Sequence, residues 1–254
     1  MDKTPIYIAG YPKSGTTFAT RLIGDALNSP TGGSIPKLDK TEPATEGKNR
    51  PGKWIVRKGH YVIRNDQRNH KTVPYAHVIN MNALKEDERV ICVFRDPRDI
   101  AVSGAAYWNM IPEDFLHDMH RGIRHCRLCG NWSEYIRRWI TYCKNDSRVI
   151  GVDYFELVEM PFDTLCYIYE WLGLEIGEIQ KARIGSAINR NSFQNTKRRI
   201  QKRGDKMPLG KHQNLKLVRK GIVGDWRNHL DQNTNNMVWD WFGREMKALQ
   251  YQRM

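Results

Sequence analysis

The sequence Ala-Gly-Tyr-Pro-Lys-Ser-Gly-Thr-Thr-Phe at residues 9–18 decides how this chain is interpreted, and it follows the apolar run Ile6-Tyr7-Ile8. An apolar strand, a turn rich in glycine and hydroxyl residues, and a helix, in that order, are typical of a phosphate-binding turn. Backbone N–H groups at Gly15 and at the start of the helix point at one spot, where the helix dipole favours an anion. Lys13 adds a point charge. Further donors are supplied by Ser14, Thr16 and Thr17.

The position of the lysine distinguishes this turn from the loop that binds nucleoside triphosphates. That loop has Lys directly after its second glycine, whereas Lys13 precedes Gly15 by two residues. The shift changes which phosphate oxygen the lysine can reach. Taken alone, the same residues are also compatible with an ordinary strand-to-helix turn.

Two further segments carry cations at positions suited to an anion. Residues 90–103 read Val-Ile-Cys-Val-Phe-Arg-Asp-Pro-Arg-Asp-Ile-Ala-Val-Ser, which predicts a buried strand that ends just before Arg95 and a helix that Pro97 opens. Ser103 lies six residues into that helix, so Arg95 and Ser103 can flank one anion. Residues 219–228, Arg-Lys-Gly-Ile-Val-Gly-Asp-Trp-Arg-Asn, place two cations before a glycine at which the backbone can close on a ligand.

Together these segments resemble the signature of the cytosolic-type sulfotransferases, enzymes that use 3′-phosphoadenosine 5′-phosphosulfate (PAPS) and release adenosine 3′,5′-bisphosphate (PAP). The motifs occur in the family's order, and near its spacing, from residue 6 to residue 230. The resemblance implies that the turn from Lys13 to Thr17 holds the donor's 5′-phosphate. It implies that the 3′-phosphate is held by Arg95, Ser103, Arg219, Lys220 and the Gly221 backbone. The implied adenine contacts are Phe18, Tyr154 and Phe193, for which core packing is the competing interpretation.

His60 is the candidate general base. It lies in Trp-Ile-Val-Arg-Lys-Gly-His-Tyr at residues 54–61, and the family's equivalent reads Lys-Thr-His-Leu-Pro. Lys58 and His60 keep the family's spacing, and residues two apart in an extended segment face the same side. Gly59 in place of Thr, and Tyr-Val in place of Leu-Pro after the histidine, depart from the family pattern.

Four residues receive catalytic roles from this comparison with the family. His60 would take the acceptor proton as a general base. Lys13 would neutralise the charge that grows on the leaving phosphate, and Lys58 would assist at the sulfuryl oxygens. Ser103 would restrain Lys13 until the acceptor arrives. No metal is expected in this reaction.

The pattern of apolar runs predicts the fold class. Strands are expected at 4–9, 54–58, 89–94 and 148–154, and helices at 16–27, 74–86, 97–108, 132–144, 161–172 and 234–249. The strands are apolar without alternating polar residues, which predicts a parallel sheet covered by helices on both faces. We therefore expect an α/β fold with a P-loop-like phosphate-binding turn, in a single sulfotransferase domain over residues 1–254. Residues 29–53 are expected to form a long loop.

The net charge of +13 could indicate nucleic acid, an acidic membrane or an acidic small ligand, and the phosphate-binding turn leaves a kinase open as well. Residues 183–227 hold thirteen Lys and Arg against two acids, and our preferred interpretation is a mobile basic cover over an anionic donor. A nucleic-acid-binding protein is one rival, although no finger, helix-turn-helix or aromatic RNA motif supports it. A P-loop kinase is the other, with Asp96 as a weak candidate for a magnesium ligand.

Composition also bears on location and partners. The sequence has no run of about 18 apolar residues, which a membrane-spanning helix would need. The N-terminus also lacks the apolar core of a signal peptide, so we expect a cytoplasmic enzyme. The Cys126-x-x-Cys129 pair has no second ligand pair at the spacing of a zinc site. The expected partner is a small-molecule or glycan acceptor, and the oligomeric state stays open.

Overall fold

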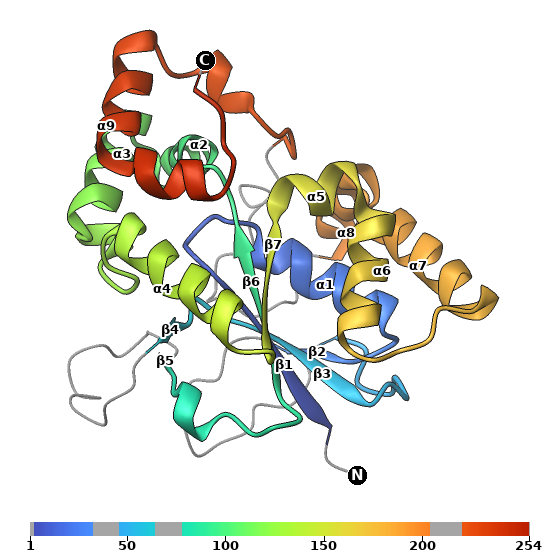
Figure 1. The fold of residues 1–254 in the computed structure, drawn as a ribbon. Helices are drawn as coiled ribbons and strands as arrows, with labels where there is room; N and C mark the ends of the chain where they lie inside the picture. Colours follow the sequence, from blue (N-terminus) through green and yellow to red (C-terminus); the bar gives the residue numbers. More distant parts are fainter. Residues whose placement is uncertain (1–2, 33–45, 64–77, 204–219, 254) are drawn as a thin grey trace.

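A parallel sheet forms the centre of the protein. The structure is a computed structural model that describes residues 3–32, 46–63, 78–203 and 220–253. Five strands lie in the order β2-β3-β1-β6-β7, and every adjacent pair is parallel (Figure 1). Their bounds are Thr4–Gly10 for β1, Thr31–Gly32 for β2, Trp54–Lys58 for β3, Arg89–Phe94 for β6 and Val149–Asp153 for β7. A second, two-stranded parallel sheet pairs β4 (Val62–Ile63) with β5 (Val78–Ile79).

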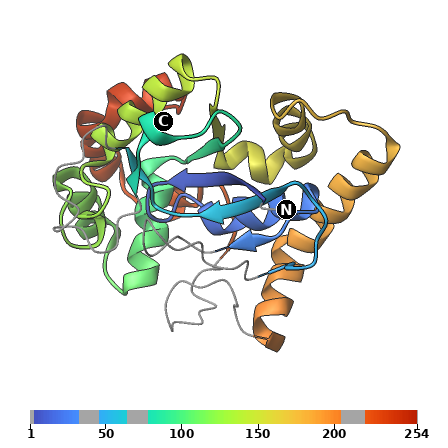
Figure 2. The ribbon, with the colours of Figure 1, turned by 90° about the horizontal axis from the view of Figure 1, so that it is seen from below.

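Helices cover both faces of the central sheet (Figures 1 and 2). One face carries α1 (Thr16–Ala26), α5 (Tyr154–Glu159), α6 (Pro161–Trp171) and α7 (Glu178–Asn191), and α8 (Phe193–Arg203) continues from α7. The other face carries α2 (Pro97–Trp108), α3 (Pro112–Arg121), α4 (Trp132–Asn145) and α9 (Gln232–Ala248). Short 3-10 turns are η1 (Met81–Ala83), η2 (Arg124–Cys126) and η4 (Asp225–Asn228).

The two-residue period of the strands explains this arrangement. Ile6 and Ile8 of β1 pack into the core cluster that contains α1, whereas Ala9 packs into the cluster that contains α2 and α4. In β6, Ile91 and Cys92 divide between the two clusters in the same way. Both faces of each central strand are thus apolar and buried, which confirms the expected parallel sheet with helices on both sides.

The order of the strands creates a binding position at the carboxyl end of β1. The chain moves from β1 outward to β2 and β3 on one side, and then crosses to β6 and β7 on the other side. The loops that follow β3 and β6 therefore diverge on either side of the loop that follows β1. In open α/β sheets this divergence leaves a crevice at the carboxyl ends of the strands, where ligands bind.

Most of the expected elements are confirmed, one expected helix is wrong, and the loop expected over 29–53 contains the short strand β2 at Thr31–Gly32. The helix expected over 74–86 is absent from its described part, where β5 pairs with β4 and Asn80 accepts a hydrogen bond from the Asn82 N–H to begin η1. Asparagine favours such local turns over helix interiors. The first part of the supposed basic cover, residues 183–203, belongs to helices α7 and α8, and its remainder at 204–219 lies outside the described residues.

The first turn of α2 anchors the C-terminal part of the chain. Arg98 is almost completely buried and forms an ion pair with Asp96 at 2.6 Å. Its guanidinium also donates to Asn235 Oδ1 and to the carbonyl of Gln252, and it lies 3.8 Å from the centre of the Trp226 ring. One side chain thus ties η4, α9 and the segment after α9 to the sheet.

We predict that Arg98→Ala lowers the free energy of unfolding by about 3 kcal/mol, because it removes the buried guanidinium that pairs with Asp96 and donates to Asn235 Oδ1 and to the Gln252 carbonyl. Arg138→Ala, on the exposed side of α4, serves as the control and should change it by no more than about 0.5 kcal/mol. Urea unfolding followed by circular dichroism measures both. Equal stabilities for the two variants would contradict this account of the anchor.

Candidate active site

The turn after β1 has the backbone geometry of an anion site. The Ser14 N–H donates to the Tyr11 carbonyl at 3.0 Å, and Gly15 at the N-cap of α1 has φ of 96°. A Cβ on Gly15 would lie 2.4 Å from the Tyr154 ring, so only glycine fits there. Lys13 also has a positive φ, of 71°. The turn therefore presents its amides and the first turn of α1 to one point.

A cavity of about 410 Å³ opens against this turn, and it collects most of the residues that the sequence singled out. They are Lys13, Gly15, Thr16, Thr17, Phe18, Lys58, His60, Arg95, Ser103, Tyr154, Phe193, Lys220 and Gly221. Ser14 does not line the cavity: it is buried under the turn, with its Oγ close to Gly10. Arg219 lies outside the described residues.

The charge of the cavity is one-sided. Among the described residues, no aspartate or glutamate lines it. The cations that line it are Lys13, Arg21, Lys58, Arg95 and Lys220. Arg21 and Lys220 form ion pairs with Glu46 and Asp225, which lie outside the lining. Such a concentration of positive charge in a concave site attracts an anion that carries several negative charges.

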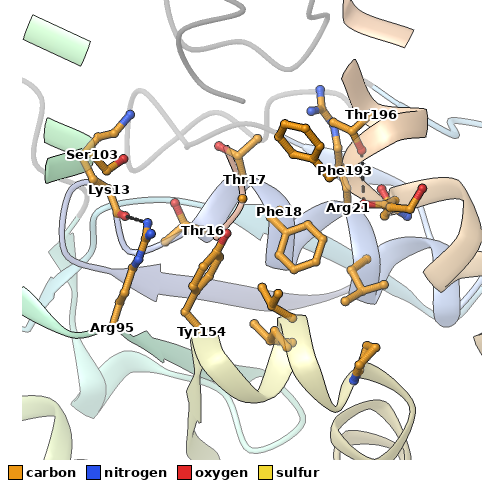
Figure 3. Close-up of a pocket in the computed structure, with 18 of the residues that line it drawn as sticks. Lys13, Thr16, Thr17, Phe18, Arg21, Arg95, Ser103, Tyr154, Phe193 and Thr196 are labelled. Atoms are coloured by element: carbon orange, nitrogen blue, oxygen red, sulfur yellow. Dashed lines mark hydrogen bonds between the residues drawn. The ribbon is translucent and has the colours of Figure 1, made fainter. Parts of the chain in front are cut away.

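Arg95 connects the strand end to the turn. It follows β6, and its Nη1 donates to the Lys13 carbonyl at 3.0 Å (Figure 3). Its guanidinium lies 4.3 Å from the centre of the Tyr154 ring, which holds it flat against an aromatic face. Ser103 of α2 and Lys13 of the turn line the same cavity, and both are labelled in Figure 3.

The ammonium of Lys13 is electrostatically disfavoured. Burial, and then the nearby Arg95, lower the pKa of Lys13 to about 7. A bound phosphate would favour the charged form and raise this pKa. Lys13 is therefore suited to respond to an anion in the cavity, since binding of the anion and protonation of the amine support each other.

His60 is fixed by the backbone of β1. Its Nδ1 lies 2.9 Å from the Gly10 carbonyl oxygen. A carbonyl can only accept, so Nδ1 carries the proton, and a neutral ring then has its lone pair on Nε2. Lys58, which ends β3, is only 2% exposed and lines the same cavity. The structure thus brings both residues of the Lys-x-His pattern to one wall.

Apolar residues that the sequence analysis missed extend the aromatic side of the cavity. Phe18 and Tyr154 meet edge to face, with ring centroids 6.1 Å apart. The additional apolar lining residues are Leu22, Leu157, Val158, Pro161, Ile188 and Ile222. They come from α1, α5, the start of α6, α7 and the segment after Lys220, and only the fold brings these together. A flat heterocycle fits such a wall.

Polar lining residues were missed as well. They are Arg21, Asn191, Ser192 and Thr196. Arg21 lies four residues after Thr17 on the same helix face, so its spacing could have identified it. The other three lie at the junction of α7 and α8, a region where the sequence analysis expected no helix.

Asp99 holds the third basic segment in place. It accepts from the N–H groups of Gly224 and Trp226, at 2.7 and 3.1 Å. Burial raises the pKa of this carboxyl, against the opposing effect of Arg95. Gly221 lies close to the Phe193 ring and has φ of 68°, so the backbone approaches the aromatic wall there. Lys220 and Gly221 reach the cavity because α2 anchors the segment that follows them.

Two alternatives from the sequence find little support in the described residues. Asp96 caps α2 and pairs with Arg98, and it does not line the cavity, so it is not available as a magnesium ligand for a kinase. All five cysteines, including Cys126 and Cys129, are free thiols. Within the described part of the chain, no cluster of three or more His, Cys, Asp or Glu side chains could hold a metal.

No helix of the described residues has the length and hydropathy that crossing a membrane requires.

Comparisons with known proteins assign the family. The sequence model of the sulfotransferase domain matches residues 3–250, so the chain belongs to the sulfotransferase domain family. Members of this class catalyse transfer of a sulfuryl group, and this is the reaction class of the protein.

Individual relatives agree with this assignment. The chain is 25% identical over 229 residues to a 3-alpha-hydroxysteroid sulfotransferase from Cavia porcellus, with 87% of this chain and 76% of the relative covered. It is 26% identical over 243 residues to sulfotransferase 2A2 from Mus musculus, which covers 91% and 80% of the two chains. The fold is similar to that of the mouse sulfotransferase SULT7A1 complexed with PAP, with a TM-score of 0.67 at 22% identity, over 97% of this chain and 86% of that chain.

We predict that Gly15→Ala lowers the free energy of unfolding by about 2 kcal/mol, because φ of 96° is strained for alanine and the new methyl meets the Tyr154 ring. Gly185→Ala is the matched control on α7, where a Cβ meets nothing within 4 Å, and it should raise the free energy by up to about 1 kcal/mol. Urea unfolding distinguishes the two. If Gly15→Ala were as stable as the wild type, the turn would not depend on its left-handed residue.

Proposed function

We propose that this protein transfers the sulfuryl group of PAPS to a hydroxyl of a small-molecule acceptor. The observation that carries the proposal is the cavity itself, in which cations surround a phosphate-binding turn, no carboxylate among the described residues lines the wall, and aromatic and apolar groups form the opposite side. PAPS has the matching chemistry, since it joins phosphates at two positions of the ribose to a flat adenine. A metal ion is not part of the proposal, because Lys13, Lys58 and Arg95 supply the positive charge.

The turn would bind one phosphate of the donor, and the cations around it would bind the other. The amides of Gly15, Thr16 and Thr17, the two threonine hydroxyls and the N-terminus of α1 suit the 5′-phosphate. The Ser14 amide, expected from the sequence to join them, donates to the Tyr11 carbonyl instead. Arg95, Ser103 and Lys220, with the Gly221 backbone and Arg219, would bind the 3′-phosphate. Phe18, Tyr154 and Phe193 would contact the adenine.

The chemistry would depend on two residues on opposite sides of the reacting group. His60, oriented by the Gly10 carbonyl, would take the acceptor proton at Nε2. Lys13 would neutralise the charge that develops on the departing phosphate, and Lys58 would stabilise the sulfuryl oxygens. Ser103 lines the same cavity as Lys13 and would limit its movement. Positioning both reactants in line would contribute as much as any single charge.

The acceptor class follows from the relatives rather than from the described residues. Two of them have hydroxysteroid sulfotransferase in their names, and a fold relative was solved with androsterone and PAP. We therefore propose a hydroxysteroid or another lipid-like alcohol as the first acceptor class to test, with phenols and glycans as further members of the panel. A cytoplasmic location is also part of the proposal, and the five free thiols fit a reducing compartment.

We predict that PAP raises the melting temperature in the presence of a chelator. At a hundredfold excess over its dissociation constant, a ligand of the native state adds about 2.7 kcal/mol, and for a chain of this size each kilocalorie corresponds to about 2–4 °C. ATP with magnesium should protect much less, because the described lining of the cavity offers no carboxylate for a metal. Thermal unfolding with each ligand measures the difference. Stronger protection by ATP with magnesium would favour the kinase alternative, and loss of PAP protection with the chelator would reopen the question of a metal.

We predict that His60→Gln lowers kcat by at least about a hundredfold, because it removes the general base. The same variant should keep the thermal protection by PAP, since the donor's phosphates do not depend on His60. His117→Ala, on the exposed side of α3 and outside the cavity, is the control and should keep its rate. Transfer of radiolabelled sulfate from PAPS to a steroid panel measures the rates of both variants, and thermal unfolding measures the protection by PAP. A rate near that of the wild type in His60→Gln would remove His60 from the mechanism.

A further inference from the structure

The side chain of Lys13 ends on an aromatic ring that the proposed mechanism does not use. Its Nζ lies 4.1 Å from the centre of the Tyr107 ring. Tyr107 lies on α2, four residues after Ser103 and therefore on the same face of the helix. An ammonium placed over a ring face at this distance is attracted by the ring quadrupole, and the attraction is stronger where water is excluded.

Tyr107 is held in position by a stack of rings. Its ring meets Trp108 edge to face, with centroids 4.8 Å apart. Trp108 stacks on His125 at 4.6 Å and on Phe115 at 5.2 Å, with interplanar angles of 23° and 15°. Phe115 belongs to the buried core. The ring over Lys13 is thus supported by α3 and η2 and does not depend on α2 alone.

The other charged groups that line the described part of the cavity are all cations. They come from four elements, and they are Arg95 after β6, Lys58 at the end of β3, Lys220 before η4 and Arg21 on α1, while the His60 ring also lines the cavity. No carboxylate lines the described part of the cavity. Burial and Arg95 lower the pKa of Lys13 to about 7. Near pH 7, Lys13 would therefore be neutral in an appreciable fraction of the molecules. A neutral amine cannot stabilise the leaving phosphate.

We propose that Tyr107 is a positioning residue for Lys13, whose ring face keeps the side chain on the α2 side of the cavity and in its charged form. The role of Lys13 at the leaving phosphate rests on the proposed sulfuryl transfer, but the contact between ring and ammonium does not. The ring stabilises the ammonium and not the neutral amine, so removing the ring lowers the pKa of Lys13. The charge is then lost at a lower pH, as the pH rises through that pKa.

The direct test measures the amine without donor or acceptor. Trace acetylation with acetic anhydride over a range of pH, read by mass spectrometry of the Lys13 peptide, reports the pH at which the amine becomes nucleophilic. In Tyr107→Leu we expect this midpoint to fall by about half a pH unit, the size of a partly buried cation–π contact. Tyr107→Phe keeps the ring face and should keep the wild-type midpoint.

Two controls separate the contact from general effects of the substitution. Lys144, exposed on α4, should keep its midpoint in every variant. Tyr167→Leu, an exposed ring on α6, should leave Lys13 unchanged. An unchanged Lys13 midpoint in Tyr107→Leu, or an equal fall in Tyr107→Phe, would overturn the proposal. Near-ultraviolet circular dichroism checks that the leucine variant is folded, and if it is not, the comparison is made with Tyr107→Met.

Kinetics then connect the contact to the reaction. The alkaline limb of kcat/KM for PAPS should move to lower pH in Tyr107→Leu. At pH values above the Lys13 midpoints of both the wild type and this variant, the kcat/KM of Tyr107→Leu should be about threefold lower than that of the wild type. Tyr107→Phe should retain the wild-type profile. The two proposals fail separately. A shifted labelling midpoint with no sulfate transfer by any variant, the wild type included, would contradict the proposed function and support the contact. Transfer by the wild type with an unshifted midpoint would contradict the contact alone.

Discussion

Two backbone carbonyls of a single turn hold the side chains around which the site is built. The Gly10 carbonyl accepts from the ring of His60, which comes from the loop after β3. The Lys13 carbonyl accepts from Arg95, which follows β6. The proposed base and a proposed phosphate-binding cation are therefore oriented by the same turn whose amides would bind the anion in the proposed function. The conformation of the turn requires Gly15, because any Cβ there would meet the Tyr154 ring.

A cavity lined by like charges is unfavourable in itself, and the surrounding structure compensates for it. Arg21 and Lys220 have carboxylate partners just outside the lining, and Arg95 lies on the face of Tyr154. Burial, and then the repulsion from Arg95, lower the pKa of Lys13. An anion that enters relieves the repulsion, so part of the binding free energy comes from charges that the fold holds close together.

The apolar pattern was sufficient to predict most of the sheet, and the motifs predicted thirteen of the 23 residues that line the cavity. Strands buried on both faces, such as β1 and β6, appear in the sequence as continuous apolar runs, because nearly every residue in them must be apolar. Helices α7 and α8 were missed because their exposed faces are rich in Lys and Arg, which obscures the short apolar stripe. The helix expected after residue 74 was wrong because β5 pairs with β4, a contact between segments distant in sequence that no local pattern reveals.

The sequence by itself determined the anion-binding turn, the order of its partner segments and the excess of positive charge, since these depend on residue type and on short spacings. Only the tertiary structure decided which of those charges share a cavity, that His60 is oriented through Nδ1, and that Lys13 rests on Tyr107. The reason is geometric. Residues far apart along the chain, on β3, β6, α2 and the segment before η4, meet at the end of β1 only because the strand order reverses there, and no spacing within one segment records that reversal.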